Sequence, residues 1–477
     1  MALYKKTKAR YPRVVPIVAS VLAALSLEAP SVLYAATVTV TSCADDGGTN
    51  TLRHAALTAA DNETIDMTQL TCSKITLISG AIDIGADYVT VVGPGENALT
   101  VDGNQNGRVF DQTAAHMTTI TDMTITGGVI SDPLPLGGCV YSKSSAQLIH
   151  ATITGCAATG TQGAAGGGVF ATKGAYFLGS TVSNNTSTST GTSGKIFSYA
   201  GGVFAGEYLV LDRSTLSGNT TKTLTGTSAG GGAVVGGKLH SKYSTITENK
   251  AIGSGASNNY GEGGGLIGFS LSNAIIDSST IDHNLADEGG GVAIVSGSAQ
   301  VMLSNSTISS NVAKIAIGGA SFAVPVAISN STIAFNNGGS LGGGGLYLNG
   351  MSADINSSII ADNAPAGMVG GNAVGADIGG SAPITGAFNL IQHSSIAVPV
   401  DTLTTDPQLS PLGCHGGATQ THALMTGSPA IDAGFADAAI NYDQRGIGFV
   451  RSAGTSADIG AYESDPDQVF GDSFDCD

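Results

Sequence analysis

The sequence predicts an all-β chain that folds as one right-handed parallel β-helix of about ten coils, with three short strands in each coil. Three observations predict it: a six-residue motif that recurs at near-regular steps, glycine runs that open the units, and three short apolar pieces in each period. A sustained period of roughly 20–50 residues indicates a repeat protein whose units are stable only when stacked. We therefore expect one elongated body.

The six-residue motif usually begins with Ser-Thr and ends with Asn. It reads STVSNN at 180–185, STLSGN at 214–219, STITEN at 244–249, STIDHN at 279–284, STISSN at 306–311, STIAFN at 331–336 and SIIADN at 358–363, with a looser copy, ATITGC, at 151–156. Measured at the second residue of the motif, the steps are 29, 34, 30, 35, 27, 25 and 27 residues. These steps lie within the range of solenoid repeats.

One unit, residues 342–363, illustrates the plan of a coil. Its apolar pieces at 346–348, 353–355 and 358–360 are separated by Gly, Asn or Ser. Strands this short become stable only by pairing with the equivalent strand one coil away, about 4.8 Å along the axis. Glycine runs open the units at 166–169, 231–234, 263–266 and 289–292, and their freedom at positive φ suits a tight corner.

The third residue of the motif is predicted to face the core, and the Ser two positions earlier faces the same way by strand alternation. The inward set is Val182, Leu216, Ile246, Ile281, Ile308, Ile333 and Ile360. Another apolar residue recurs five positions earlier, and since five is odd, a bulge or turn must separate the two pieces. We place that bend at Asp212, Asp277, Asn305, Asn330 and Asn356, because Asn and Asp suit turns.

The last residue of each motif is predicted to form a ladder of stacked amides that bond to one another and to the backbone. The ladder set is Asn185, Asn219, Asn249, Asn284, Asn311, Asn336 and Asn363. The alternative is N-glycosylation, because Asn185, Asn219, Asn305, Asn330 and Asn356 each begin an N-x-S/T sequence.

Residues 1–35 have the pattern of a secretory signal peptide: a basic start, an apolar run at 14–27 and small residues at 35–36. The apolar run is shorter than the roughly 20 residues that a membrane span needs, so we expect no transmembrane span. The predicted organisation is a signal peptide at 1–35, an N-terminal cap with the first coils at 36–110, the repeats at 111–400, a C-terminal cap at 401–464 and a tail at 465–477.

Charge excludes several classes of partner. Without residues 1–35, the chain keeps 14 Lys and Arg against 35 Asp and Glu, a net charge of −21. Such a surface repels nucleic acid and anionic lipid, so no nucleic-acid partner is expected. It also repels polyanionic sugars unless cations or local Lys clusters intervene.

The six cysteines are Cys43, Cys72, Cys139, Cys156, Cys414 and Cys476. An even number in an exported chain predicts disulfides, although six cysteines allow 15 pairings. Proximity in sequence favours Cys43 with Cys72 and Cys139 with Cys156, which leaves Cys414 with Cys476. No pair has the C-x-x-C spacing typical of zinc sites.

Residues 51–61 form the one convincing helical stretch, with Asn50 as its expected N-cap and a role as a cap over the first coil. Strands are expected at 74–77, 82–84 and 88–92. The run TLRHAALTAADNETIDM from Thr51, with the strands after it, resembles the opening of bacterial right-handed parallel β-helix repeat proteins and polymorphic outer-membrane-protein-like chains. It departs from that pattern at His54 and Ala56.

The far end resembles the choice-of-anchor Q domain of exported bacterial proteins, through SPAIDAG at 428–434, DQRG at 443–446, Arg451 and DIGAYE at 458–463. The resemblance implies a fold and a surface or extracellular address, and it implies no reaction. The charged residues of this segment are Asp432, Asp443, Arg445, Arg451, Asp458 and Glu463. We predict that they form a buried ion-pair network closing the last coil, with a catalytic or calcium site as the rival interpretation.

Candidate catalytic residues are Asp282, Glu248 and His283. Asp282 and Glu248 differ by one motif position on adjacent units, and with His240 and Lys242 they form the densest titratable cluster of the repeats. A glycoside hydrolase needs two carboxylates roughly 5–10 Å apart, but no lyase or galacturonase signature surrounds these residues. Solvated turn residues are the favoured interpretation, and no GxSxG, HExxH or phosphate-loop motif offers another chemistry.

The expected function is an exported structural or adhesin-like bacterial protein, secreted or associated with the cell surface or outer membrane, without an evident catalytic centre. A polysaccharide-active enzyme of the pectate-lyase-like fold is the first alternative, and a non-catalytic carbohydrate- or calcium-binding module is the second. A carbohydrate or cell-surface ligand is the expected partner. No resident cofactor is expected, with calcium left open, and the oligomeric state is left open too.

Overall fold

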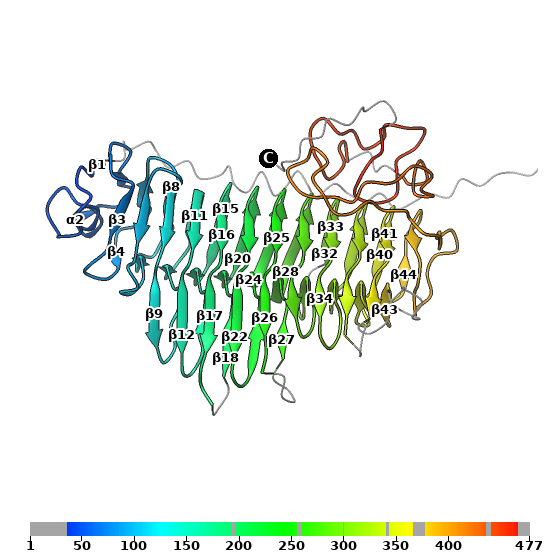
Figure 1. The fold of residues 1–477 in the computed structure, drawn as a ribbon, viewed down its shortest axis with the longest axis horizontal. Coiled ribbons are helices and arrows are strands. Elements are labelled where there is room, and N and C mark those ends of the chain that lie inside the picture. The colour runs from blue at the N-terminus through cyan, green and yellow to red at the C-terminus, as the bar shows by residue number, and fades with distance from the viewer. Residues whose placement is uncertain are drawn as a thin grey trace, which may run out of the picture.

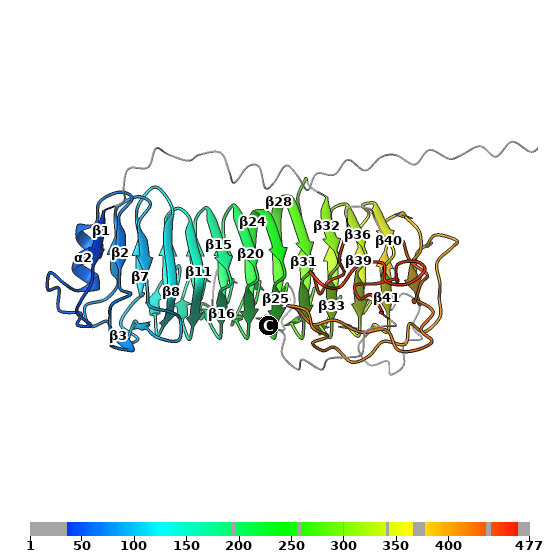
Figure 2. The same ribbon diagram turned by 90° about the horizontal axis from the view of Figure 1, so that it is seen from above.

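The chain winds as a parallel β-solenoid of about 11 turns, close to the predicted number. The computed structural model describes residues 36–192, 196–254, 260–298, 300–339, 343–365, 377–435 and 440–465. The expected signal peptide at 1–35 and the tail from residue 466 lie outside these ranges. Figures 1 and 2 show the stacked coils as one elongated body with a helix at the N-terminal end.

Three faces surround the core, and every strand pairing along them is parallel. The first face contains β4 (Ile82–Ile84), β7 (Phe110–Gln112), β10 (Val140–Ser142), β14 (Val169–Ala171), β19 (Val203–Ala205), β24 (Ala233–Lys242), β28 (Leu266–Asp277), β31 (Val292–Ile294), β35 (Ala320–Phe322), β39 (Leu346–Leu348) and β43 (Ile378–Gly380).

The second face shares β24 and β28 with the first. Its other strands are β1 (Thr37–Thr39), β2 (Thr64–Asp66), β5 (Thr90–Val92), β8 (Thr118–Thr126), β11 (Ala146–Thr154), β15 (Gly174–Leu178), β20 (Tyr208–Asp212), β32 (Val301–Ser304), β36 (Val326–Ser329), β40 (Ala353–Asn356) and β44 (Ile384–Thr385). The third face carries the six-residue motif and shares β8 and β11 with the second.

The other strands of the third face are β3 (Lys74–Thr76), β6 (Thr100–Asp102), β16 (Thr181–Ser183), β21 (Thr215–Ser217), β25 (Thr245–Thr247), β29 (Thr280–Asp282), β33 (Thr307–Ser309), β37 (Thr332–Ala334), β41 (Ile359–Ala361) and β45 (Leu390–Ile391). Because the shared strands continue around corners, the three faces join into one 32-stranded sheet.

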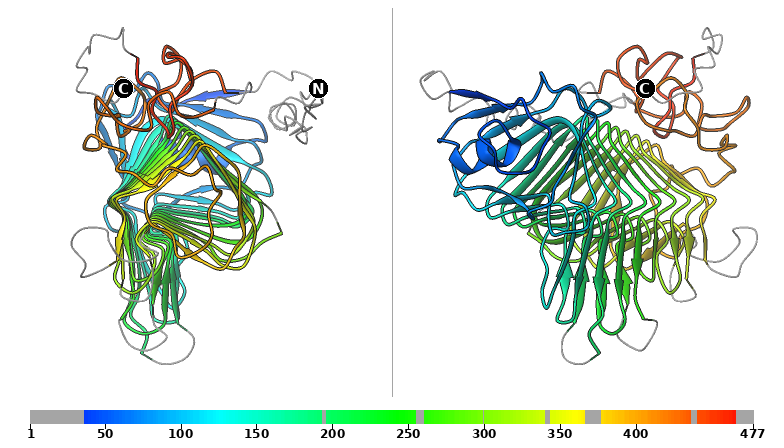
Figure 3. Two further views of the ribbon diagram at one scale, coloured as in Figure 1. Left: turned by 90° about the vertical axis from the view of Figure 1, so that its right-hand side faces the viewer. Right: turned by 60° about the vertical axis from the view of Figure 1, so that its left-hand side comes forward.

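A fin projects from the solenoid between the third face of one coil and the first face of the next (Figure 3). Its outgoing layer is a nine-stranded sheet of β9 (Val129–Asp132), β12 (Ala157–Gly160), β17 (Thr186–Ser189), β22 (Thr220–Thr223), β26 (Lys250–Ile252), β30 (Leu285–Ala286), β34 (Val312–Ala313), β38 (Asn337–Gly338) and β42 (Ala364–Pro365). Its returning layer contains β13 (Ala164–Ala165), β18 (Phe197–Tyr199), β23 (Thr227–Ala229) and β27 (Gly261–Glu262).

Small polar side chains fill the space between the two layers of the fin. The hydroxyl of Thr221 donates to Ser198, and the Ser187 and Ser198 hydroxyls lie 3.0 Å apart, all three being buried. Such short side chains allow the layers to approach closely while their hydroxyl groups remain hydrogen-bonded.

The N-terminal end is covered by α2 (Leu52–Thr58), which confirms the predicted helix in a shorter form. Its N-cap is Thr51, whose hydroxyl accepts the amide of His54, so the expectation of Asn50 was wrong by one residue. Leu52, Ala55 and Ala56 are buried. The helix therefore shields the apolar interior that the first coil would otherwise expose.

The predicted core is confirmed. The inward residues of the motif, from Val182 to Ile333 and Ile360, are all 0% exposed. Their neighbours along the axis are in register, with Ile281 paired to Ile308 and Ile308 to Ile333. Each column of Val, Leu and Ile thus continues from coil to coil as one apolar interior.

The bend between the second and third faces lies at the residue directly before the motif. That residue has a positive φ in Arg213 (48°), Tyr243 (48°), Ser278 (49°), Asn305 (46°), Asn330 (46°) and Ser357 (46°). The predicted positions Asn305 and Asn330 are therefore right, whereas Asp212, Asp277 and Asn356 precede the bend by one residue. Backbone geometry recurs here without a recurring residue type, which explains the error.

Seven motif asparagines form a continuous ladder, and each is at most 1% exposed. The Asn219 side-chain amide donates to Val182 O (2.8 Å) and to Asn249 Oδ1 (2.9 Å), while its backbone N–H also donates to Asn249 Oδ1 (3.0 Å). The same three bonds recur on the following coils, for example at Asn249 and Asn284.

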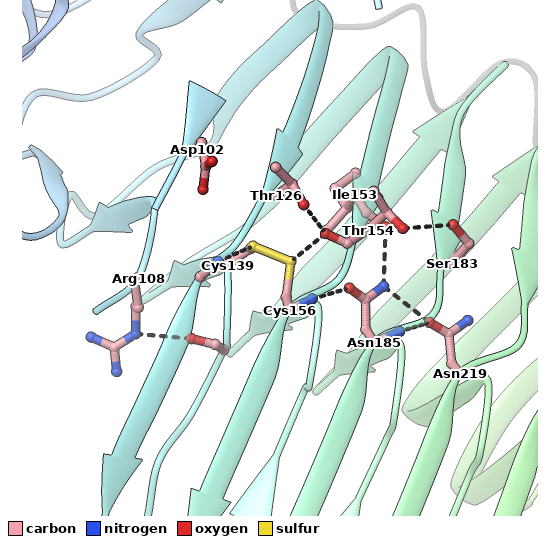
Figure 4. The surroundings of a disulfide bond; sticks show 12 residues. Asp102, Arg108, Thr126, Cys139, Ile153, Thr154, Cys156, Ser183, Asn185 and Asn219 are labelled. Atoms are coloured by element: carbon pink, nitrogen blue, oxygen red, sulfur yellow. Dashed lines mark hydrogen bonds between the residues drawn. A yellow bond between two sulfur atoms is a disulfide. The ribbon is translucent and has the colours of Figure 1, made fainter. Parts of the chain in front are cut away.

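Different residue types terminate the ladder at its two ends. At the N-terminal end, Cys156 occupies the asparagine position and its N–H donates to Asn185 Oδ1, as Figure 4 shows. At the C-terminal end, the buried Asp377 accepts hydrogen bonds from the backbone N–H and from the side-chain amide of Asn363. Every amide of the ladder is thereby hydrogen-bonded although it is removed from water.

A serine ladder runs parallel to the asparagine ladder at the start of each motif. The N–H of Ser214 donates to the hydroxyl of Ser244 on the next coil, 3.1 Å away. That hydroxyl donates in turn to Lys242 O at 2.8 Å. These serines thus satisfy the backbone groups released by the positive-φ bend.

Two predicted disulfides are present, between Cys43 and Cys72 and between Cys139 and Cys156. The second joins the start of the asparagine ladder to β10 at the first face (Figure 4). The third predicted pair, Cys414 with Cys476, includes a residue outside the described ranges.

The C-terminal module, residues 401–465, packs against the side of the solenoid instead of closing its last coil (Figures 1 and 2). Gln444 Nε2 donates to the Thr280 hydroxyl, and the Thr307 hydroxyl donates to Gln444 Oε1. Ile359 and Ala361 of β41 pack in an apolar cluster with Ile459 of the module. The outward residues of β29, β33, β37 and β41 are buried as a result.

We predict that Asn249→Ala lowers the free energy of unfolding by about 3 kcal/mol or more, because it leaves two donors of Asn219 and the Leu216 carbonyl unpaired in the interior. Urea unfolding of the full chain measures the change. The matched control is Asn273→Ala, on the outward side of β28, for which we expect less than about 0.5 kcal/mol. Equal effects at the two positions would contradict the ladder.

Candidate functional site

The first face and the returning layer of the fin meet at a corner that follows the solenoid axis. The floor of the corner is the outward column of the first face, Tyr141, Phe170, Phe204, Val234, Ile267, Ala293, Ser321 and Tyr347. The wall is the column Ala165, Tyr199, Ala229, Glu262 and Glu288. Both columns arise because each coil places equivalent residues at the same point.

The corner changes character along its length. At the N-terminal part the rings of Tyr141, Phe170 and Phe204 stack, with centroids 5.8 and 4.7 Å apart. In the middle, Val234 and Ile267 pack against the fin residue Ala229 in a small apolar cluster. Towards the C-terminal coils, acidic and polar side chains replace the apolar ones.

A half-open pocket of about 320 Å³ lies at this polar part of the corner. It is lined by residues that include Glu262 and Glu288 on the wall, Ala293, Ser321 and Tyr347 on the floor, and Asn349 directly after β39. Ser321 and Tyr347 are half-buried, and Asn349 is exposed. A pocket of this size lies at the small end of the roughly 300–1,000 Å³ typical of ligand sites.

The two glutamates lie next to each other on adjacent coils, where Glu262 and Glu288 form a parallel β-bridge. Burial raises the pKa of Glu262, and the charge of Glu288 adds to this effect. Burial, and then the charge of Glu262, also raise the pKa of Tyr199. Among the described residues, no Lys, Arg or His lines the pocket, and neither glutamate takes part in an ion pair.

These glutamates are not among the residues predicted from the sequence, although the sequence carries a signal for them. Each directly precedes a glycine run, in EGGGL at 262–266 and EGGGV at 288–292, so both occupy the same offset on adjacent units. Gly263 and Gly289 have positive φ values of 62° and 63°. They turn the chain from the fin wall onto the first face, which brings both carboxyl groups to the corner.

Both pocket carboxylates belong to one wall on neighbouring coils. In the described part of the chain the lining contains no cationic side chain, so the polar side-chain groups it offers a ligand are two carboxyls, a hydroxyl, a phenol and an amide.

The sequence-predicted candidates Asp282, Glu248 and His283 are brought together at the exit turn of the third face. Asp282 is 3% exposed, its Oδ2 accepts the Thr247 hydroxyl, and it lies 2.6 Å from His283 Nδ1. This hydrogen bond raises the pKa of His283, although partial burial opposes the rise. Glu248 and His283 both have positive φ values (58° and 51°) and are exposed.

Two members of the wider predicted cluster lie elsewhere. His240 and Lys242 are on β24, on the second face, where burial lowers the pKa of His240 and Lys242 pairs with Asp277 at 3.6 Å. The cluster is therefore divided between two faces, and its buried member Asp282 holds a turn.

A serine–histidine pair links the module to the solenoid. Ser309 Oγ lies 2.8 Å from His422 Nε2, and His422 Nδ1 lies 2.7 Å from Ser410 O, so the neutral ring donates to this carbonyl and accepts from the serine. Ser309 is 0% and His422 3% exposed. A nucleophilic serine must reach its substrate, so this buried pair serves docking.

Five of the six charged residues predicted for the C-terminal segment are buried inside the module, whereas Asp432 is exposed. Arg445 forms a two-point contact with Asp443 and lies between the Phe449 and Tyr462 rings, 4.0 and 3.9 Å from their centroids. Arg451 lies 3.4 Å from Glu463, whose pKa burial raises to about 7.

The remaining acids of this set bind backbone amides. Asp458 accepts the N–H groups of Asp432 and Ser464, and Asp432 accepts that of Ser456. In the described ranges, no three His, Cys, Asp or Glu side chains are arranged to hold a metal ion.

Comparison with known proteins gives one structural likeness. No protein-family model and no curated protein matches the chain. A solved structure, "Crystal structure of pectate lyase Pel9A", is similar with a TM-score of 0.40 and 12% identity, covering 91% of this chain and 98% of that one. We infer nothing about activity from this likeness. The assignment of the solenoid fold follows from the strand pairing of this chain. The resemblances of the two ends to named families remain predictions.

We predict that His422 makes module docking sensitive to acid. Burial lowers the pKa of the folded imidazole to about 4, so between pH 6.5 and 4 the unfolded chain binds the proton more readily. The stabilisation is therefore full above about pH 6.5 and is lost towards pH 4, by up to roughly 3 kcal/mol.

Urea unfolding as a function of pH tests this. The difference in stability between the wild type and His422→Gln should shrink from pH 6.5 to 4, whereas His150→Gln, at an exposed histidine, should leave the profile unchanged. Parallel profiles for the wild type and His422→Gln would contradict the assignment.

Proposed function

We propose that the chain is an exported, adhesin-like binding protein that holds its ligand in the pocket at the corner between the first face and the fin. The observation that carries the proposal is the pocket itself, half-open on the side of a solenoid whose coils are hydrogen-bonded along their length. A ligand bound there meets a preformed surface, which lowers the entropy cost of binding.

An extracytoplasmic location fits this function. Two disulfides cross-link the first coils, and such bonds persist in oxidising compartments. No helix in the described ranges is long and apolar enough to span a membrane. The predicted signal peptide supports export, and surface association remains part of the proposal.

We favour binding without turnover over catalysis because the carboxylate pair occupies a single wall and, in the part of the chain that the structure describes, has no cationic partner. The aromatic side chains of the floor, with Tyr347 in the pocket, offer flat contact surfaces to a sugar. A carbohydrate ligand therefore agrees with the pocket, and an extended one can continue along the apolar part of the corner.

We expect Ser321→Trp to fill the pocket and to weaken binding to any ligand found in a polysaccharide panel by at least about tenfold. The matched control is Thr215→Trp, at an outward, half-buried position of the third face. Isothermal titration measures binding, and assays for reducing or unsaturated ends test for turnover.

Loss of binding in Ser321→Trp alone, without product release, supports the proposal. Binding that survives Ser321→Trp would remove the pocket as the site. Release of reducing or unsaturated ends by the wild type would replace the binding protein with an enzyme.

A further inference from the structure

We infer that the pocket selects a glycan with free amino groups, such as an N-deacetylated hexosamine chain, whose ammonium groups bind between Glu262 and Glu288. The inference rests on the proposed function and adds to it the chemical class of the ligand.

The wall of the pocket is acidic. Two glutamates on adjacent coils project from one wall into a pocket that holds no Lys, Arg or His among the described residues. The neighbouring acid Asp287 has Lys314 Nζ at 3.7 Å and accepts the Gly261 N–H, whereas within the described ranges the two glutamates form no ion pair. Like charges on neighbouring coils repel each other, and the partial burial of both side chains strengthens the repulsion. A cationic group between them would relieve the repulsion and form charge-assisted hydrogen bonds.

The charge of the whole chain disfavours anionic ligands. Without the predicted signal peptide, the net charge is −21. A polyanionic glycan would approach a repelling surface and meet two carboxylates in the pocket. An amino glycan is attracted by both.

Beside the acidic wall, the pocket offers one aromatic and two polar side chains. Tyr347 supplies a half-buried aromatic side chain, and Ser321 and Asn349 supply a hydroxyl and an amide at the same pocket. A sugar ring has an apolar face for the tyrosine and hydroxyl groups for the two polar side chains. This combination of one aromatic contact and a few polar groups is typical of small-molecule sites.

The paired strands of the floor favour a glycan over a basic peptide. An extended peptide gains much of its affinity by pairing its main chain with a free sheet edge. The strands of the floor have no such edge, because β28 pairs with β24 and β31, and β35 pairs with β31 and β39. Recognition must therefore come from side chains alone, which suits a rigid ring that carries polar groups around its rim.

The experiment titrates four probes into the full exported chain at about pH 6.5, where amines are largely protonated. The probes are a β-1,4-linked glucosamine tetramer, its fully N-acetylated counterpart, tetragalacturonate and tetralysine. The variants are Glu262→Gln and Glu288→Gln, which keep the side-chain shape, with Ser321→Trp to block the pocket. Glu248→Gln, at an exposed glutamate of the third-face turn, is the matched control. Circular dichroism verifies that each variant is folded.

We expect the glucosamine tetramer to bind more tightly than the other three probes and to weaken as salt is added. Each glutamine variant should lose about tenfold or more in affinity, and Glu248→Gln should retain it.

The N-acetylated tetramer could bind as tightly as the glucosamine tetramer, with binding that is kept in both glutamine variants and lost in Ser321→Trp. That result would overturn the amino-glycan inference and leave the proposed function intact. Tetralysine binding that depends on both glutamates would overturn the inference in favour of a basic peptide. If no probe binds, or if the binding of every probe is unchanged in Ser321→Trp, both the amino-glycan inference and the pocket as the binding site are contradicted.

Discussion

Hydrogen bonding between successive coils is the constraint on which the rest of this structure depends. No strand of three residues is stable alone, and here each gains its partners from the coils before and after it. The asparagine and serine ladders extend the same principle to the corners, where the backbone bends and its amides would otherwise be buried unpaired. Stability and shape therefore have one origin, the repetition of equivalent residues at equivalent places.

The same repetition positions the functional features. A residue type that recurs at one offset becomes a column on the surface, as the stacked rings of Tyr141, Phe170 and Phe204 do on the first face. Glu262 and Glu288 form such a column, two coils long, at the point where the floor changes from apolar to polar. The C-terminal module covers outward threonines of the third face and, on its last coils, the Ala and Ile that replace its polar residues. Local departures from the repeat thus mark the places where the solenoid meets something else.

The repeating interior was readable from the sequence because it depends on patterns a few residues long, such as the inward Ile of each motif and its terminal Asn. The bends were only partly predictable, since a positive φ recurs there in Arg213, Tyr243 and Ser278 alike. The pocket could not be predicted without the position of the fin. No local pattern indicates that the residue before a glycine run lies beside the outward side chains of the first face. The docking of the module depends on contacts such as Gln444 with Thr280, which are separated by 164 residues.

Native-state hydrogen exchange of the full chain tests the central claim most directly, because it reads the backbone amides that the ladders bury. The relevant peptides cover residues 214–219, 244–249 and 279–284, with Asn219, Asn249 and Asn284 at their ends. The account predicts that the amides of these three segments are equally protected and lose protection together as denaturant is added. Exchange there at the rate of an unstructured chain, or loss of protection in one coil while its neighbours keep theirs, would contradict it.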